Sequence, residues 1–231
     1  MTVTSVGDLT PSVQNYLKAI WSLQEWTTDP VTASRIAERV ELRTSTVSGA
    51  LAKLTEQGLI EHDRYGAVEL TEAGRTMALA MVRRHRLIET FLVKVLDYSW
   101  DQVDDEAENL EHAVSDFMVD RIDEVLGRPT RDPHGDPIPD ADGTITMPDA
   151  VRLTGVVAGS TVLVERISDR DPGLLQHLES TGVLPGARLT VGEGEPYSGA
   201  IEVRVGDGDG VNLGTAATDA VFVTVLAASA S

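Results

Sequence analysis

Residues 32–70 read TASRIAERVELRTSTVSGALAKLTEQGLIEHDRYGAVEL, and this stretch decides how the first part of the chain folds. Within it, residues 32–40 predict a short helix that begins at Thr32, because their apolar side chains recur at helical spacing. After it, Val47, Leu51 and Leu54 recur at the same spacing and predict a second helix that begins after Thr44 or Ser45 and is ended by Gly58. Two short helices joined by a tight turn are typical of a helix-turn-helix.

A hairpin is predicted directly after the second helix. Residues 59–70 alternate apolar and polar side chains around Tyr65-Gly66, which is the pattern of two strands joined by a turn. Upstream, Thr10 and Pro11 predict the beginning of another helix, as an N-cap followed by a proline at the first helical position. Helices followed by a hairpin in this order indicate a winged helix-turn-helix.

The charge of the chain bears on whether this motif binds DNA. The formal net charge of −18 opposes nucleic-acid binding, since phosphate contacts need Lys and Arg. The acid is concentrated elsewhere, however: residues 76–148 hold 7 basic and 16 acidic residues, whereas 1–75 hold 7 and 10, and 43–55 hold no acidic residue. The second helix, with Thr44 or Ser45 as its expected cap, carries small hydroxyl and basic side chains suited to base edges and phosphates.

We therefore predict a DNA-binding face on that helix. Its members are Arg43, Thr44, Ser45, Thr46, Ser48 and Lys53. The alternative is a helical hairpin whose polar face is simply solvated.

Composition excludes several other classes of protein. The chain has 231 residues and no cysteine, so disulfides, zinc–thiolate sites and thiol nucleophiles are ruled out. Its apolar runs are far shorter than the roughly 20 residues of a membrane helix. The first residues lack the basic and apolar segments of a signal peptide. We expect a cytoplasmic protein without a membrane partner.

The predicted elements divide the chain into three domains, over residues 1–75, 76–148 and 149–231. The middle domain is helical, and its helices are predicted over residues 71–95, 100–114 and 115–127. It has more apolar positions than three helices need for packing against one another, which favours a helical dimer interface. A connection rich in Pro, Asp and Gly follows these helices. After residue 149, short β-type runs and one helix at 171–181 predict a small β-barrel-like domain. The fold class is mainly α with a C-terminal β domain.

The helices of the middle domain carry a cluster of possible metal ligands. On a helix that advances about 100° per residue, four polar residues fall within an arc of about 100°. These are Asp104, Glu108, Glu111 and His112. His85 and Glu89 are i, i+4 neighbours on the preceding helix, and antiparallel packing would bring both groups together.

Three interpretations of this cluster are open. The acids could be a solvated face with surface histidines, or the ligands of a hydrolytic metalloenzyme, or a sensory metal site. No nucleophile motif or separate acid–base group supports the hydrolase. Carboxylate oxygen and imidazole without a thiolate suit Mn²⁺ or Fe²⁺ better than copper or structural zinc.

Nearly the whole chain resembles the diphtheria-toxin-repressor family of metal-dependent transcription repressors. The resemblance rests on RIAERV, TVSGAL and LTEAGR in the first domain, RRHRLIE and DEAENLEH in the second, and DPHGDPIP after it. It implies a homodimer that binds a palindromic DNA operator of metal-homeostasis genes when loaded with Mn²⁺ or Fe²⁺. It also implies an SH3-like, FeoA-like C-terminal domain.

The resemblance also assigns the ligands of a principal metal site. They fall on Glu108, Glu111, His112 and, from the first helix, Asn15. The iron branch of the family has cysteine where this chain has Glu108, so the resemblance favours the manganese branch, with an iron(II)-dependent repressor as the alternative. Lys18 stands where two-ion manganese sites have a further acidic ligand, which favours two separated ions per subunit.

A second site is implied at His85, Glu89 and Asp104. The stretch VERISDRD of the tail is expected to add a ligand to it, Asp169, with Glu165 and Asp171 as alternatives. Arg86 matches an arginine that binds an anion near this site. Asp132 and Asp136 fall on the other anion contacts and either pair with Arg86 directly or are solvated residues of a linker.

Overall fold

The computed structural model describes residues 5–62, 66–194 and 199–226. Its internal contacts divide the chain into two compact units. One unit comprises Met1–His85, Leu110–Arg121 and Pro139–Thr144, and the other comprises Arg86–Asn109, Ile122–Ile138 and Ile145–Ser231. The chain passes from one unit to the other within three of its helices. The three predicted domain ranges stay a prediction.

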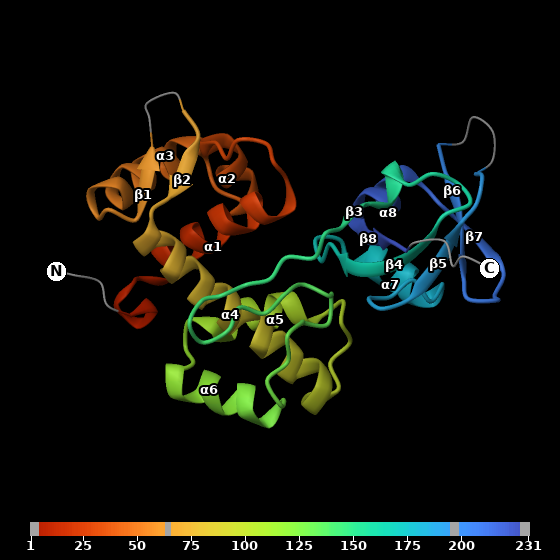
Figure 1. Ribbon diagram of the computed structural model, residues 1–231. Coiled ribbons are helices and arrows are strands. Elements are labelled where there is room, and N and C mark those ends of the chain that lie inside the picture. The colour runs from red at the N-terminus through yellow and green to blue at the C-terminus, as the bar shows by residue number, and fades with distance from the viewer. Residues whose placement is uncertain (1–4, 63–65, 195–198, 227–231) are drawn as a thin grey trace. The chain divides into compact units, whose positions relative to one another are not determined.

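The first unit contains the predicted winged helix-turn-helix, which is confirmed (Figure 1). Its elements are the 3-10 helix η1 (Val6–Asp8), the helices α1 (Pro11–Trp26), α2 (Ala33–Arg39) and α3 (Thr44–Glu56), and the strands β1 (Ile60–His62) and β2 (Val68–Leu70). The two strands pair antiparallel, with Ile60 opposite Leu70. Tyr65, at the predicted turn of this hairpin, lies outside the described residues.

The predicted N-caps are correct for α1 and α2 but not for α3. Thr10 Oγ1 accepts a hydrogen bond from the Val13 N–H, and Thr32 Oγ1 accepts one from the Arg35 N–H. The expectation that Thr44 or Ser45 caps α3 is wrong. The N-cap is Arg43, which makes no side-chain cap hydrogen bond, because α3 already begins at Thr44.

The apolar faces of these helices form the core of the winged helix. Leu17 and Ile20 of α1, Ile36 of α2, and Leu51 of α3 are completely buried. α2 contacts both α1 and α3. Burial of one such side chain contributes about 1.5–3 kcal/mol. This packing buries the apolar face of α3 and leaves its polar face exposed to solvent.

Three helices lead through the middle of the chain. They are α4 (Glu72–Leu96), α5 (Val103–Glu111) and α6 (Asp116–Val125). The prediction that the second of them spans 100–114 is wrong at both ends. α5 ends at Glu111 because residues 112–115 must turn the chain toward α6, where Ser115 Oγ accepts a hydrogen bond from the Met118 N–H. His112 therefore lies in a turn and not on the helix.

The tail is a β domain, as predicted, and its strands form an antiparallel sheet. Its strands are β3 (Val151–Arg152), β4 (Thr161–Ile167), β5 (Arg188–Val191), β6 (Ile201–Val205), β7 (Gly210–Leu213) and β8 (Val221–Val225). They lie in the order β3-β8-β4-β5-β6-β7. Within the described residues the edge strands β3 and β7 do not pair, so closure into a barrel is not confirmed.

Helices complete this domain. The predicted helix at 171–181 is α7 (Pro172–Ser180), whose N-cap Asp171 accepts a hydrogen bond from the Leu174 N–H. Neither β7, α8 (Thr215–Ala220) nor the 3-10 helix η2 (Leu153–Gly155) was predicted. β7 follows a Gly- and Asp-rich run, and α8 is too short for its apolar residues to repeat.

Two segments from outside the tail belong to the same unit. Trp100, which precedes α5, is part of the tail's hydrophobic core. Residues 131–137 form a tight loop closed by a bridge between Arg131 and Pro137. This loop lies against β4, because the Ile167 N–H donates to the His134 carbonyl. The connection predicted between the second and third domains is thus an ordered element.

None of the helices in the described part of the chain is long and apolar enough to cross a membrane.

Candidate metal centre and DNA-binding surface

α3 presents the predicted DNA-binding side chains to solvent. All six predicted residues are exposed: Arg43, Thr44, Ser45, Thr46, Ser48 and Lys53. The opposite face of the helix carries Val47, Leu51 and Leu54, which are buried. Since Arg43 leaves the beginning of α3 without a side-chain cap, the first N–H groups of the helix are available to a phosphate. Ser48 Oγ donates to the Thr44 carbonyl, which leaves it able only to accept.

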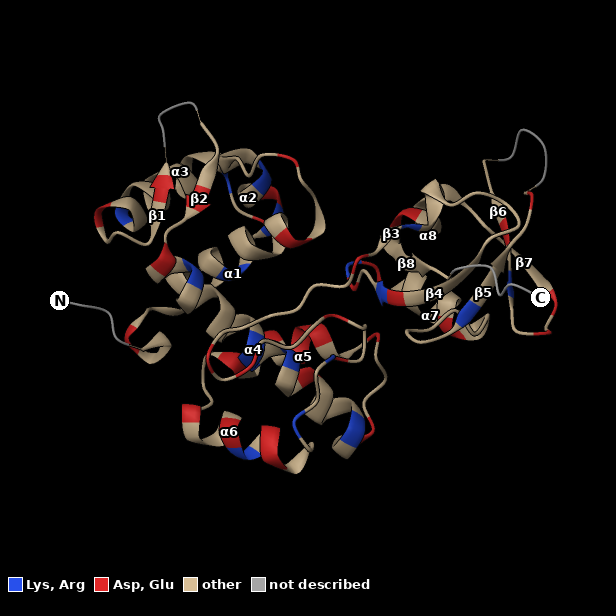
Figure 2. Ribbon diagram, viewed as in Figure 1, with Lys and Arg blue, Asp and Glu red and all other residues tan. Residues whose placement is uncertain are grey.

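The predicted metal cluster surrounds Glu111, the last residue of α5. Acidic residues lie along α5 and α6 (Figure 2). Glu111 is fully buried, and its Oε2 lies 2.6 Å from His85 Nδ1 of α4. Its Oε1 lies 3.7 Å from His112 Nε2. The structure therefore brings three of the predicted ligands together within the first unit.

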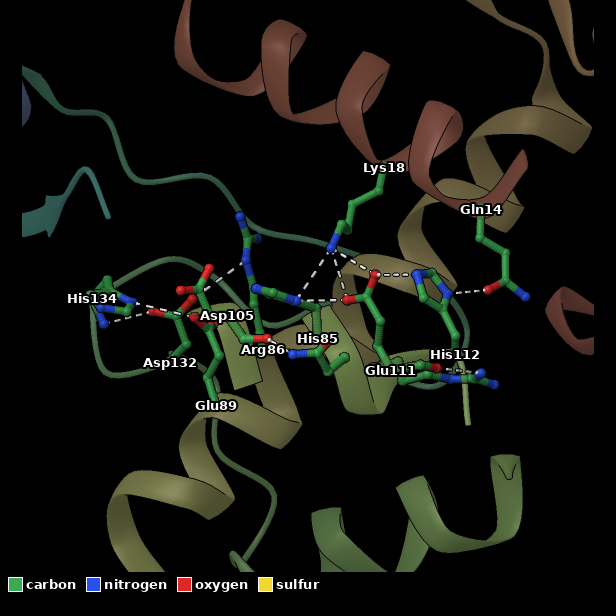
Figure 3. Close-up of polar contacts among 12 residues, drawn as sticks. Gln14, Lys18, His85, Arg86, Glu89, Asp105, Glu111, His112, Asp132 and His134 are labelled. Atoms are coloured by element: carbon green, nitrogen blue, oxygen red, sulfur yellow. Dashed lines mark hydrogen bonds and ion pairs between the residues drawn. The ribbon is translucent and has the colours of Figure 1, made fainter. Parts of the chain in front are cut away.

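Gln14 of α1 orients His112 in this cluster. The amide nitrogen of Gln14 donates to the carbonyls of Val6 and Leu9, so its Oε1 must act as an acceptor. His112 Nδ1 donates to that oxygen over 2.6 Å (Figure 3). The neutral imidazole then keeps its lone pair on Nε2, which faces Glu111. Metal-binding histidines commonly use their second nitrogen in this way.

Lys18 of α1 brings a positive charge into the same cluster. Its Nζ donates to both Glu111 oxygens, at 2.7 and 2.8 Å, and lies 3.3 Å from His85 Nδ1 (Figure 3). Burial of Glu111 opposes its ionisation, but His85 and Lys18 outweigh this effect and hold its pKa below the ordinary value. In this arrangement the ammonium group holds the Glu111 carboxylate that the resemblance assigns to a metal.

Two further predicted ligands lie on the helices α1 and α5, which also carry Lys18 and Glu111. Asn15 lies on α1 next to Gln14, and its Oδ1 is buried without a hydrogen-bond partner among the described residues. Glu108 is half-buried and lies one turn before Glu111 on α5. A buried amide oxygen that accepts no hydrogen bond destabilises the folded protein unless a ligand or ion binds to it. The oxygen and imidazole donors here thus fit a hard divalent cation.

The second unit contains a buried ion-pair network around Arg86. Its Nε lies 3.5 Å from Asp132 Oδ2, and one of its terminal nitrogens lies 3.4 Å from Asp136 Oδ2. Arg166 of β4 also approaches Asp136, at 2.7 Å. The interpretation in which both aspartates pair with Arg86 is confirmed, and the solvated linker is wrong. Both anionic partners of Arg86 that are seen here are thus carboxylates of the chain itself.

Three residues that could bind a metal ion lie close together beside this network. Glu89 of α4, His134 of the 131–137 loop and Asp169 each offer one atom within 4.8 Å of the other two. Asp104 of α5 also offers a carboxylate oxygen within that distance of Glu89. Two of the residues predicted for the second site thus lie close to Glu89, together with a histidine that was not predicted.

The ionisation of this second cluster is strongly perturbed. Burial disfavours the charged form of His134, but the carboxylates of Glu89, Asp132 and Asp169 outweigh this effect and raise its pKa to about 9. Burial, reinforced by Glu89, raises the pKa of Asp132 to about 6. The carboxylates gathered here favour the binding of a positively charged group or ion.

Sequence reasoning missed Gln14 and His134 as contributors to these clusters. No helical spacing links Gln14 to His112, which lies 98 residues away. His134 stands in a Pro- and Gly-rich stretch without periodicity, although DPHGDP does contain the residue. A histidine between two aspartates was the available signal.

The chain matches three family models. Residues 8–68 match the N-terminal DNA-binding domain of iron-dependent repressors, and residues 71–140 match the metal-binding and dimerisation domain of the same proteins. Residues 151–225 match the FeoA domain. The three matches follow the order of the winged helix, the helices α4 to α6 and the tail sheet.

Individual relatives agree with these matches. The chain is 39% identical over 199 residues to the iron-dependent repressor IdeR of Mycobacterium leprae, covering 80% of this chain and 86% of that protein. A solved manganese-dependent transcriptional repressor in complex with manganese is 51% identical, with a TM-score of 0.88, covering 93% of this chain and 100% of that chain. The manganese regulator SloR is 32% identical, with a TM-score of 0.76 and coverages of 94% and 100%.

The family consists of DNA-binding regulators and not enzymes, so the hydrolase alternative is excluded. The predicted resemblance is confirmed. The chain belongs to the iron-dependent repressor family, that of the diphtheria toxin repressor, and is a metal-dependent transcriptional repressor.

Proposed function

We propose that this protein is a manganese-dependent repressor that acts as a homodimer on a palindromic operator of metal-homeostasis genes in the cytoplasm. The observation that carries the proposal is the donor set around Glu111. It consists of carboxylate, imidazole and amide groups without any thiolate. The proposed principal ligands are Glu108, Glu111, His112 and Asn15, and the proposed second-site ligands are His85, Glu89, Asp104 and Asp169.

The choice of manganese has two supports. Carboxylate oxygen at Glu108, where iron-type relatives carry cysteine, favours a hard ion. The manganese-dependent repressor described above is 51% identical to this chain. An iron(II)-dependent repressor is the second candidate, because IdeR of Mycobacterium leprae is 39% identical. We further propose two ions per subunit.

The proposed mechanism couples metal binding to DNA binding through α1. Asn15 lies on α1, whereas Glu111 and His112 lie at the end of α5, so residues that hold one ion would tie these segments together. α1 contacts α2, and α2 contacts the DNA-binding helix α3. When bound, Mn²⁺ supplies positive charge that compensates the buried carboxylates. A conformation that binds metal better would then also bind DNA better.

The ammonium of Lys18 opposes coordination of a metal ion by the Glu111 carboxylate, because both cations bind the same oxygens and repel each other. It occupies both oxygens at hydrogen-bond distance. Lys18 therefore holds the buried carboxylate and would compete with an ion for it. This competition makes the fully assembled site conditional on metal concentration.

Exposed apolar side chains support the homodimer. Phe117 and Val125 of α6 are 76% and 66% exposed. Exposed apolar residues that gather on one helix favour an interaction surface there. Both lie within the residues that match the metal-binding and dimerisation model. A dimer would present two copies of α3 to the two halves of a palindrome.

One experiment tests the proposal. Duplexes selected from a random pool by the full-length protein with Mn²⁺ would be titrated for binding with Mn²⁺, with anaerobic Fe²⁺ and with chelator. We expect specific retention with Mn²⁺ that chelator abolishes. Stronger activation by Fe²⁺ at equal free metal would favour the iron-dependent candidate, and retention independent of any metal would contradict both.

A further inference from the structure

Gly49 lies well inside α3, on the side of the helix that is exposed to solvent. The helix runs from Thr44 to Glu56, so Gly49 has more than one helical turn on either side. The buried residues Val47, Leu51 and Leu54 lie on the other face. Glycine inside a helix is less favourable than alanine by about a factor of five in the folding equilibrium, because it loses more backbone freedom. Helix formation therefore does not explain a glycine here.

The packing of the protein gives no reason for this glycine either. A Cβ added to Gly49 would meet no atom within 4 Å, and the φ of Gly49 lies outside the left-handed region that favours glycine. Gly74 of α4 shows the opposite case, because a Cβ there would lie 1.8 Å from the Leu59 carbonyl oxygen. Packing thus requires glycine at position 74, whereas alanine at position 49 fits the free protein and would stabilise it.

The neighbours of Gly49 on the surface of α3 are small or basic. Residues three and four positions apart lie next to one another on a helix. By this spacing the neighbours are Ser45, Thr46, Ala52 and Lys53, and all four are exposed. None of them carries a negative charge, although the formal net charge of the chain is −18. The open space at Gly49 therefore lies within the face that we propose for DNA binding.

The side chains on this face limit how closely α3 can approach a duplex. A helix with its side chains is about 10–12 Å across, and the major groove of B-DNA is about 12 Å wide. Side chains that point into the groove therefore keep the helix backbone away from the base edges. At Gly49 no side chain intervenes, so the backbone itself can contact the bases. Close approach of the backbone to a ligand is a common reason for a glycine.

We propose that Gly49 is the point of closest contact between α3 and the bases of the operator. The missing side chain lets the backbone of α3 lie deep in the major groove, which determines the base edges and phosphates that Ser45 and Lys53 can reach. Gly49 is thus a specificity-determining residue that weakens α3 in the free protein and strengthens the complex. The inference rests on the proposed function, in that α3 is the helix that binds the operator.

Gly49→Ala in the full-length protein tests this inference, because it adds a single methyl group. It should raise the melting temperature by about 2–4 °C. In anisotropy titrations with the activating metal ion, it should weaken binding to the duplexes selected by the wild type about tenfold or more, since the unfavourable contact occurs in both half-sites. Gly155→Ala is the matched control: Gly155 is exposed in the tail, and an added Cβ would also meet no atom within 4 Å. The control should leave operator binding unchanged.

Two further variants separate this inference from the proposed function. Gly49→Gln should select duplexes with a different base pair in each half-site, because its amide holds the helix further out and reads bases itself. Ser45→Asp reports whether α3 binds DNA at all. Unchanged affinity in Gly49→Ala and unchanged selection by Gly49→Gln, with weaker binding by Ser45→Asp, would overturn the inference and leave the proposed function standing.

Two other results would also contradict the inference. Unchanged binding in all three variants would overturn it together with the proposed role of α3. A lower melting temperature of Gly49→Ala would show that the fold itself requires the glycine, and would remove the reason for assigning it to DNA contact.

Discussion

Replacement of Lys18 by methionine tests the competition at Glu111. The change removes the ammonium but keeps an unbranched side chain of similar length. Lys18 Nζ makes two hydrogen bonds to a fully buried carboxylate, at 2.7 and 2.8 Å, and is itself only 14% exposed. Without it, Glu111 loses a partner in the metal-free state, whereas the metal-bound state does not need that partner.

The contacts set the size of the effect. A hydrogen bond to a charged group contributes about 1.5–3 kcal/mol, and about 1.4 kcal/mol is a factor of ten in an equilibrium constant. We therefore expect Lys18→Met to tighten Mn²⁺ binding at the principal site about tenfold to a hundredfold. The metal-free protein should lose stability by a comparable amount, because a buried carboxylate that has lost a partner is costly.

Calorimetric titration with Mn²⁺ measures the first effect, and denaturant unfolding in chelator measures the second. Lys94→Met, at an exposed position of α4, is the matched control and should alter neither quantity. Weaker or unchanged Mn²⁺ binding by Lys18→Met would refute the reasoning, because the ammonium would then not compete with metal. Tighter binding without loss of stability would show that Lys18 does not hold the carboxylate in the metal-free state.

Three further changes test individual contacts. Gln14→Leu should weaken Mn²⁺ binding about 10–100-fold in calorimetry, because His112 loses the acceptor that orients it; unchanged affinity would contradict this role. Gly135→Ala should destabilise the protein in denaturant unfolding by more than Gly143→Ala, since both have positive φ but only Gly135 meets a backbone oxygen; equal losses would show that the loop yields easily. Ser45→Asp should weaken DNA binding by anisotropy without changing Mn²⁺ affinity, because it places a negative charge on the exposed face of α3; an unchanged DNA affinity would remove this face from the interface.

Local patterns predicted most of the fold. Thr10 and Thr32 cap their helices as expected, and the alternation of residues 59–70 gives the hairpin, because these features depend on neighbours in sequence. The cap of α3 was predicted wrongly, since a threonine is equally compatible with the N-cap and with the first helical position. β7 was not predicted either, because the Gly- and Asp-rich residues before it are typical of a loop.

The clusters were predictable only in part. Glu108 and Glu111 lie one turn apart on one helix, as do His85 and Glu89, so helical spacing alone predicts that the members of each pair are close. The contacts of Lys18 and Gln14 depend on where α1 packs, which no local pattern encodes. His134 depends on a loop that folds back on β4. Tertiary packing therefore decides which polar residues complete each cluster.

The same packing explains why the core of the tail includes a residue from outside the predicted third domain. Trp100 lies outside residues 149–231, yet it is part of the tail's hydrophobic core. Its position before α5 resembled a helix beginning, whereas α5 begins at Val103. An aromatic residue that fills the core of another segment cannot be recognised from periodicity.

The central claim is that the residues around Glu111 make DNA binding depend on metal. The most direct measurement is operator affinity as a function of free Mn²⁺ for the wild-type protein and for His112→Gln, with His177→Gln as the control. We predict that Mn²⁺ strengthens operator binding by the wild type and the control, and that His112→Gln remains folded but no longer responds. An unaltered Mn²⁺ response in His112→Gln would contradict the account.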